Sequence, residues 1–327
     1  MNAAEKKIKK NNCVPVIVGP TASGKTSLAI KIALEFGAEI ISCDSRQIYK
    51  FMDIGTAKPS REQLNSVTHH LIDIITPDLS FSYADFASAA AVKIKEILGR
   101  GRLPIIVGGT GFYLDGLING ISQIPQFDQN EARRLRDGLE LEETAFLVSE
   151  LRKLDMESAS RIKHNDRQRL VRAIIVSKLS GSPFSSYKDA REKNNEYNYL
   201  IFGLTKSREL LYNNINLRVD EMFSDNLVGE VAYLLKKGYT QFMPGMKSIG
   251  YQECIEHFNG RISIEEARAL IKQNTRNYAK RQLTYFKRFK FKNWFEKDDV
   301  SINDSKVYEA VIAEISKKYI KRCDPDE

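Results

Sequence analysis

The run GPTASGKT, near the start of the chain, limits the possible folds more than any other feature, because it fits the pattern G-x-x-x-x-G-K-[ST] in full. An apolar run at 14–18 precedes it and a helical pattern at 27–36 follows it, so the run joins a predicted strand to a predicted helix. In such a loop, backbone N–H groups, the helix N-terminus and the lysine bind phosphate oxygens, and the final hydroxyl suits a phosphate-bound Mg²⁺. We therefore predict a di- or triphosphate site, and the loop alone leaves the choice between them open. Its residues are Gly19, Pro20, Thr21, Ala22, Ser23, Gly24, Lys25 and Thr26.

The composition is that of a globular protein with one large or two modest domains, since 327 residues exceed one small core and 42% of them are hydrophobic. No stretch approaches the roughly 18 uncharged apolar residues of a membrane span, and the lysine-rich first residues lack the apolar region of a secretory signal. We therefore expect a cytoplasmic protein. The four cysteines are widely spaced and form no C-x-x-C pair, so we expect reduced thiols and no zinc site.

Positive charge is concentrated near the C-terminus. The chain has a net charge of +8, and residues 267–295 contain nine Lys and Arg but no Asp or Glu. Aromatic side chains are interleaved with these cations. A stretch of one charge repels itself, and contacts with a phosphate backbone would relieve that repulsion. The pattern favours a polyanionic partner, with the aromatic side chains either stacking on bases or packing in the core.

Strand and helix patterns alternate through the first 120 residues. We predict strands at 14–18, 39–43, 70–75 and 103–107 and helices at 27–36, 81–98 and 112–118. The strand segments are apolar without alternation, which indicates strands covered on both faces and hence an α/β fold with a mostly parallel sheet. After residue 125 the chain becomes charged and helical. One more short strand is expected at 201–204, and the chain from 207 onward is helical in pattern.

Two further segments follow predicted strands and are candidates for a ligand site at the carboxyl edge of the sheet. Asp44 follows the strand at 39–43, where it can hold Mg²⁺, act as a general base or stabilise a turn. The run GGTG at 108–111 follows the strand at 103–107, and its glycines permit either the close approach of a ligand or an ordinary turn. The sequence by itself leaves these alternatives open.

The helix predicted after Asp166 has polar donors on one face. Leu170 and Val171 belong to its buried stripe. The opposite face carries Gln168, Arg169 and Arg172. Arg and Gln are good donors to phosphate groups and base edges, although an isolated helix with this pattern equally suits a solvated surface. A later arginine, Arg218, precedes an acidic pair, which by itself indicates only a surface ion pair.

These runs, taken in order, resemble the tRNA dimethylallyltransferase family, also called tRNA isopentenyltransferases, along nearly the whole chain. The matching runs are GPTASGKT at 19–26, DSRQIY from Asp44, MDIGTAKP from Met52, HHLID from His69, VGGTG from Val107, NDRQRLVRA from Asn165, LRVDEM from Leu217, MKSIGYQE from Met246 and YAKRQLTYF from Tyr278. Their joint order and spacing make the resemblance specific. Tyr285 stands where many relatives carry Trp, which preserves an aromatic side chain. The sequence has no C-terminal Cys/His zinc finger of the eukaryotic kind, which favours a bacterial-type enzyme.

The resemblance implies transfer of a dimethylallyl group from dimethylallyl diphosphate to the exocyclic amine of the adenosine 3′ to the anticodon, in tRNAs that read codons beginning with U. The GPTASGKT loop would hold the donor diphosphate, with Mg²⁺ near Thr26. Asp44 would take a proton from the attacking amine, and Thr110 would contact the target nucleotide. Lys25 and Arg218 would stabilise the leaving diphosphate. Further tRNA contacts, besides Asp44 and Thr110, are implied for Ser45, Arg46, Gln47, Arg133, Gln168, Arg169, Leu170, Val171 and Arg172.

The resemblance also implies a P-loop α/β core like that of nucleotide kinases, interrupted by a helical insertion that clamps the anticodon stem-loop. We expect the core, with its helical C-terminal region, at residues 1–121 and 197–327, and the insertion at 122–196. The implied partners are tRNA and dimethylallyl diphosphate. We expect a monomer without membrane attachment.

Three other functions fit part of this pattern. A small-molecule or nucleotide kinase would use the same loop and core, but the acid-free basic stretch speaks against it. An adenylate isopentenyltransferase that acts on free nucleotide would need the donor loop and the base but no tRNA-binding surface. A non-catalytic RNA-binding module would leave Lys25, Thr26 and Asp44 unexplained.

Overall fold

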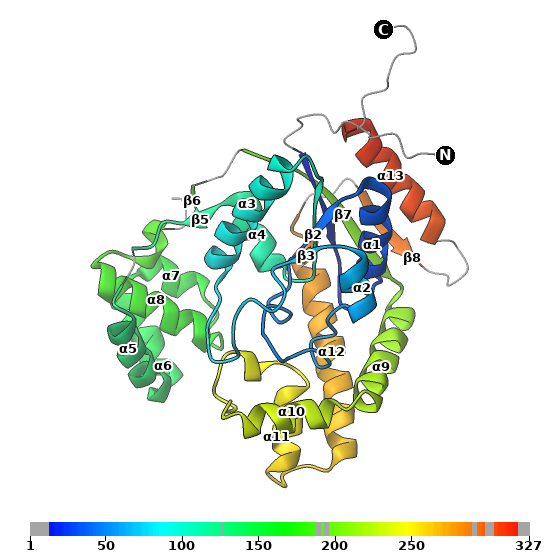
Figure 1. Ribbon diagram of the computed structural model, residues 1–327. Coiled ribbons are helices and arrows are strands. Elements are labelled where there is room, and N and C mark those ends of the chain that lie inside the picture. The colour runs from blue at the N-terminus through cyan, green and yellow to red at the C-terminus, as the bar shows by residue number, and fades with distance from the viewer. Residues whose placement is uncertain are drawn as a thin grey trace, which may run out of the picture. The chain divides into compact units, whose positions relative to one another are not determined.

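The computed structural model describes residues 13–125, 127–187, 191–192, 196–289, 293–297 and 304–319. The chain divides into two compact units. The larger comprises Met1–Ile118 and Asn195–Glu327, and the smaller comprises Asn119–Asn194. Figure 1 shows the elements of both units, with the smaller unit, drawn in green, made mainly of helices.

A six-stranded parallel sheet forms the centre of the larger unit, which confirms the predicted α/β fold (Figure 1). Its strands lie in the order β3-β2-β4-β1-β7-β8, and each neighbouring pair is parallel. The strands are β1 (Cys13–Val18), β2 (Glu39–Ser42), β3 (His69–His70), β4 (Pro104–Gly108), β7 (Asn198–Lys206) and β8 (Asn293–Lys297). Every residue of β1, β2 and β4 is buried, as expected for strands covered on both faces.

Helices connect and cover these strands. They are α1 (Lys25–Phe36), α2 (Arg61–Ser66), α3 (Tyr83–Gly99), α4 (Gly111–Asn119), α9 (Arg208–Ser224), α10 (Leu227–Lys236), α11 (Tyr251–Phe258), α12 (Ile264–Phe286) and α13 (Asp304–Tyr319), with a 3₁₀ turn η2 (Gly245–Lys247). Capping boxes begin both α3 and α12, from Ser82 with Asp85 and from Ser263 with Glu266. None of the helices that the structure describes is long and apolar enough to cross a membrane.

Two strands differ from the prediction. The strand expected at 70–75 is only two residues long, because Leu71 and Asp73 have φ angles of 61° and 55°, which lie outside the β region. The prediction of helix alone from residue 207 onward is wrong at β8, which pairs with β7 at the edge of the sheet. A strand added at an edge draws its stability from pairing with its neighbour, which the local sequence pattern does not reveal.

Apolar packing divides the larger unit into regions. Helices α1 and α13 pack on the sheet through side chains that include Ile17, Ile32, Ile105, Phe202 and Val311. A second cluster joins the segment after β2 to the C-terminal helices. It includes Ile48, Met52, Val219, Leu227, Tyr251 and Ile271. This second cluster holds the segment that follows Asp44 against α9–α12.

The smaller unit has its own core. Helices α5 (Gln129–Leu141), α6 (Thr144–Leu154), α7 (Met156–Arg161) and α8 (Arg167–Ser180), with a 3₁₀ turn η1 (Phe184–Tyr187), surround it. Leu147, Leu151, Leu170 and Ile174 are all fully buried there. Strands β5 (Ile121–Ser122) and β6 (Arg191–Glu192) pair antiparallel. The predicted start of α8 after Asp166 is confirmed, since Asp166 caps the helix, and Gly181, with φ of 68°, follows its end.

Candidate active site

Three loops meet at the carboxyl edge of the central sheet. They follow β1, β2 and β4, and β4 lies between the other two strands. The contact between the last two is tight, because a Cβ added at Gly108 would lie 2.0 Å from the carbonyl oxygen of Cys43. The backbone N–H of Thr110 also donates to that oxygen, at 3.2 Å. The glycine run therefore serves close packing of the protein's own backbone.

The loop after β1 has the backbone conformation of a phosphate cradle. Gly24 has a φ of 90° and precedes α1 without any side chain that caps the helix. Ala22 has a φ of 62°, which is uncommon for a residue with a side chain. The hydroxyl of Ser23 is buried and has no hydrogen-bond partner among the described residues. A helix N-terminus and a buried hydroxyl without a partner are features that a bound phosphate would satisfy.

Two cations lie at this loop, Lys25 within it and Arg218 beside it. Lys25 Nζ donates to the carbonyl oxygen of Pro20 at 2.5 Å, and Arg218 donates to the hydroxyl of Thr21 at 3.3 Å. Burial and the positive charge of Arg218 lower the pKa of Lys25 to about 7, while Asp44 acts in the opposite direction. Burial likewise lowers the pKa of Arg218. Two partly dehydrated cations in one place favour the binding of an anion with more than one charge.

Gln282 of α12 joins the loop after β1 to the loop after β4. Its side-chain oxygen accepts a hydrogen bond from the backbone N–H of Thr21, and its amide nitrogen donates to the carbonyl oxygen of Gly109, both at 2.9 Å. A Cβ added at Gly109 would lie 2.3 Å from that amide nitrogen, so only glycine leaves room for this contact. Ala22 packs in the same region against Ala279 of α12. Helix α12 therefore fixes the phosphate loop from outside.

Asp44 begins the loop after β2 and makes a turn. Its Oδ1 accepts hydrogen bonds from the backbone N–H groups of Arg46 at 2.8 Å and Gln47 at 3.3 Å. No hydrogen bond from the described residues engages its Oδ2 in the structure. Thr110 lies beside it, because the Thr110 hydroxyl accepts from the backbone N–H of Ser45 at 3.0 Å. Asp44 is thus both a turn residue and a carboxylate with one oxygen available.

Tyr278, also on α12, completes this side of the site. Burial and then the Asp44 carboxylate raise the pKa of Tyr278 to about 12, while Arg46 and Thr110 act in the opposite direction. Its hydroxyl therefore stays protonated at neutral pH. The Tyr278 hydroxyl therefore lies close enough to feel the charge of Asp44 and to form a hydrogen bond with Thr110.

Tyr278 and Gln282 were not among the residues that the sequence predicted for the site. They lie at i and i+4 of α12, and Tyr285 follows at i+7, where its ring fills the space that a Cβ at Gly111 would occupy. One face of the helix therefore covers the loops of the site. The i, i+4, i+7 spacing of these residues within YAKRQLTYF indicates a shared helix face. The Lys and Arg residues between them instead favoured a solvent-exposed helix.

The neighbours of Asp44 are held by the protein itself. Arg46 donates to the carbonyl oxygen of Pro244 at 3.1 Å. Gln47 donates to the carbonyl oxygen of Ala57 at 3.1 Å, and its side-chain oxygen accepts from Ser42 at 3.2 Å. Both ends of the Gln47 amide are therefore used to hold the next loop. Contacts of these residues with a nucleic acid remain a prediction.

The other predicted tRNA contacts lie in the smaller unit. Exposed side chains there include Arg133 on α5 and Gln168, Arg169 and Arg172 on α8. Leu170 and Val171 are buried in the core of that unit, so their side chains do not reach its surface. Arg169 forms an exposed ion pair with Asp166 at 3.2 Å. The exposed members of the run are the ones that can reach a phosphate group.

The residues at the phosphate loop fit Mg²⁺. The described residues contain no group of three His, Cys, Asp or Glu that could hold a metal by themselves. Thr26 lies in the first turn of α1, directly after Lys25, and the Ser23 hydroxyl beside it is buried and without a partner. Mg²⁺ commonly keeps several waters and binds through few protein groups plus substrate phosphates. A hydroxyl together with diphosphate oxygens matches that preference.

Comparisons with known proteins agree with this geometry. The family model described as IPP transferase matches residues 47–289, and the model described as isopentenyl transferase matches residues 12–79. The tRNA dimethylallyltransferase of Caldanaerobacter subterraneus subsp. tengcongensis is 45% identical over 291 residues, and that of Thermoanaerobacter sp. is 46% identical over 294 residues. Each match covers 88% of this chain and 92% of the relative.

Solved structures give the same result. A full-length tRNA isopentenylpyrophosphate transferase from Bacillus halodurans is 38% identical, with a TM-score of 0.69, and the match covers 94% of this chain and 97% of that one. A eukaryotic dimethylallyltransferase acting on tRNA is 26% identical, with a TM-score of 0.79, and the match covers 95% of this chain and 81% of that one. The family model matches most of the chain, and these relatives are similar to it over nearly its whole length. The chain therefore belongs to the IPP transferase family, which includes the tRNA dimethylallyltransferases.

Proposed function

We propose that this chain transfers a dimethylallyl group from dimethylallyl diphosphate to the exocyclic amine of the adenosine 3′ to the anticodon, in tRNAs that read codons beginning with U. One observation carries the proposal. A phosphate loop flanked by Lys25 and Arg218 lies beside a carboxylate, Asp44, that influences the pKa of Lys25. A diphosphate leaving group and a group that accepts a proton are the two requirements of this transfer.

The leaving group is stabilised by the loop and its cations. When the allylic C–O bond breaks, the diphosphate takes the electron pair and gains negative charge. Lys25, Arg218 and the backbone N–H groups at the start of α1 face that charge. Thr26 would help to hold Mg²⁺, which would supply further positive charge near the diphosphate. Such groups, fixed in place before the reaction, stabilise a developing anion most effectively.

The attacking amine is deprotonated on the other side of the site. As the amine nitrogen forms its bond to the allylic carbon, it must lose one proton, and Asp44 accepts it. The turn hydrogen bonds to Oδ1 fix the carboxylate and leave Oδ2 for this role. Thr110 and Tyr278 supply hydroxyl groups that orient the target nucleotide beside it. A positioned carboxylate must come within hydrogen-bond reach of the proton that it takes.

Access to the adenosine requires that it leave its base stack, since chemistry on an exocyclic amine needs an exposed base. We propose that four exposed residues of the smaller unit bind the tRNA backbone. They are Arg133, Gln168, Arg169 and Arg172. Arg46 and Ser45 would meet the nucleotides next to the target. These contacts would distinguish the protein from an enzyme that acts on a free nucleotide.

Direct assay of the product tests the proposal. The protein is incubated with Mg²⁺, dimethylallyl diphosphate and unmodified tRNA, and the digested nucleosides are examined for isopentenyladenosine by mass spectrometry. Parallel reactions contain adenosine monophosphate in place of tRNA, or ATP in place of dimethylallyl diphosphate. We expect product only with tRNA and the prenyl donor. Equal prenylation of the free nucleotide, or ATP turnover without prenyl transfer, would contradict the proposal.

A further inference from the structure

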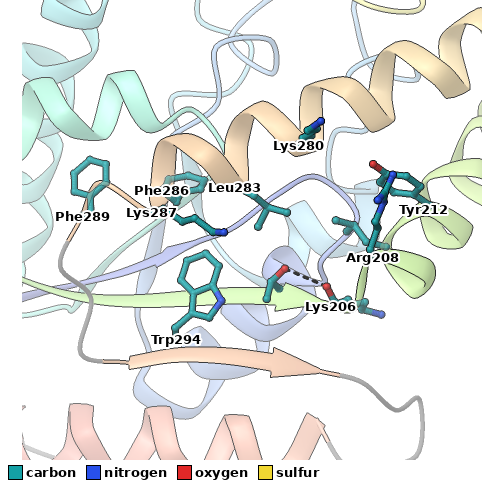
Figure 2. A pocket seen from close by; sticks show the side chains of 11 residues that line it. Lys206, Arg208, Tyr212, Lys280, Leu283, Phe286, Lys287, Phe289 and Trp294 are labelled. Atoms are coloured by element: carbon teal, nitrogen blue, oxygen red, sulfur yellow. Dashed lines mark hydrogen bonds between the residues drawn. The ribbon is translucent and has the colours of Figure 1, made fainter.

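A cavity in the larger unit adjoins the site described above without containing its residues, since Leu211, Tyr212 and Leu283 line it and pack in one cluster with Ala22 of the phosphate loop. It has a volume of about 570 Å³ and lies between the end of β7, the start of α9, the last turns of α12 and β8. None of Asp44, Thr110, Arg218 or the phosphate-loop residues lines it. Figure 2 shows its side chains, with the α12 residues above and Trp294 below. The volume falls in the range of about 300–1,000 Å³ that is typical of small-molecule pockets.

The cavity is strongly cationic. Four of its side chains carry positive charge, and they come from three separate segments. They are Lys206, Arg208, Lys280 and Lys287. Of the described residues that line the cavity, none is Asp or Glu. No ion pair within the described part of the chain neutralises these four groups, so an anionic ligand would reduce their mutual repulsion.

Apolar and aromatic side chains form the rest of the wall. Leu211 and Phe286 are almost fully buried beneath it, and Tyr212 lies at one end, with the Arg208 guanidinium 5.2 Å from the centre of its ring. Trp294 lies at the other end and points toward the last turns of α12 (Figure 2). A flat ring system can stack on such side chains, whereas water gains little from them.

The Trp294 ring is fixed by the sheet itself. Trp294 on β8 pairs with Gly203 on β7, and a Cβ added at Gly203 would lie 1.9 Å from the ring. The ring therefore lies across the backbone at a position where any side chain would displace it. An aromatic platform held in this way is already in place before a ligand arrives, which reduces the entropy cost of binding.

We propose that this cavity is a binding site for a nucleoside di- or triphosphate, separate from the phosphate loop. The base stacks on the aromatic wall, and the phosphates contact the lysine and arginine side chains. Several cations around an aromatic wall suit a ligand that carries several negative charges together with a flat ring. Inorganic phosphate would satisfy the first feature only, and a prenyl diphosphate lacks the flat ring.

The test uses tryptophan fluorescence, because Trp294 is the only tryptophan in the chain. ATP is titrated into the full-length protein, and the same titration is repeated by calorimetry. We expect a saturable change in emission. Lys206→Glu combined with Lys280→Glu should weaken the apparent affinity at least about tenfold, the effect of removing about 1.4 kcal/mol. The matched control Lys236→Glu, an exposed lysine of α10 outside the cavity, should leave it unchanged.

A second variant separates this cavity from the phosphate loop. Lys25→Ala weakens any binding at the loop and should preserve the ATP response of Trp294. Circular dichroism establishes that each variant is folded, and Trp294→Phe followed by calorimetry measures the loss of stacking without charge reversal. Loss of the response in Lys25→Ala would overturn the proposal, because ATP would then occupy the phosphate loop. An equal response to dimethylallyl diphosphate, to inorganic triphosphate or only to an RNA oligonucleotide would also overturn it.

Discussion

Replacing Gln282 by methionine should destabilise the protein and weaken its hold on the prenyl donor. Methionine preserves most of the side-chain volume but can replace neither hydrogen bond. The backbone N–H of Thr21 and the carbonyl oxygen of Gly109 would each lose their partner at 2.9 Å. An unsatisfied buried polar group costs about 1–3 kcal/mol. The bond to Thr21 is only partly buried, so water can compensate there, and we expect a total loss of about 2–3 kcal/mol.

The loss should be measured in two ways. Urea unfolding gives the change in free energy, and steady-state kinetics give the KM for dimethylallyl diphosphate. The KM for dimethylallyl diphosphate should rise about tenfold, because a phosphate loop that Gln282 no longer holds must become ordered when the donor binds. Gln282→Glu provides a second test, since a carboxylate can accept from Thr21 but places a buried negative charge against the carbonyl oxygen of Gly109. At neutral pH its unfolding free energy should fall at least as far below that of the wild type as that of Gln282→Met.

A control on the same helix separates this effect from a general loss of helix stability. Gln273 is exposed on α12, so Gln273→Met should change the unfolding free energy by less than about 0.5 kcal/mol. If Gln282→Met unfolds at the same urea concentration as the wild type and has the same KM for the donor, the bridge has no role in stability or in donor binding. That result would refute the reasoning above.

Three further predictions concern the chemistry and the tRNA. Asp44→Asn keeps an oxygen for the turn but cannot accept the proton, so transfer should fall by about 10²–10⁴-fold while tRNA binding in a filter assay is retained; near-normal turnover would exclude Asp44 as the base. Burial and Arg218 lower the pKa of Lys25 to about 7, so its amine is neutral above that pH. The amine must regain a proton to hold a diphosphate, and the affinity for inorganic diphosphate should therefore fall as the pH rises above 7. Calorimetry in buffers of different ionisation enthalpy should detect this proton uptake, and Lys25→Arg should abolish it. Finally, Arg169→Ala and Arg172→Ala should each reduce the salt dependence of tRNA binding by a slope of about 1, whereas an unchanged slope would make these side chains an ordinary solvated surface.

The central strands and the phosphate loop were predictable because local sequence determines both. Continuous apolar runs marked β1, β2 and β4, and a glycine pattern between a strand and a helix marked the loop. The shortening of β3 was not predictable, since Leu71 has no special preference for the left-handed conformation that it adopts, and an Asp such as Asp73 tolerates that conformation without requiring it. Strand β8 is likewise defined by its pairing with β7.

The residues of the candidate site that follow strands could be predicted from the sequence, whereas those on α9 and α12 could not. Asp44 and Thr110 follow strands, so topology alone brings them together. Arg218 gave no sign of its position beside Thr21 apart from family resemblance, because its neighbours in the sequence are acidic. Gln282 has cationic neighbours in the sequence, and the pattern of its helix is typical of a solvent-exposed helix. Its contacts with two loops depend on the tertiary fold.

The hydrogen bond between Thr21 and Gln282 also limits when the phosphate loop can be fixed during synthesis on the ribosome. The two residues are 261 positions apart. At about 5–20 residues per second, synthesis of that interval takes about 13–52 s. During this time the nascent chain has its phosphate loop but lacks the helix that holds it. The contact that holds the phosphate loop therefore forms only when translation is almost complete, and a chain truncated before α12 would contain the loop without the helix that fixes it.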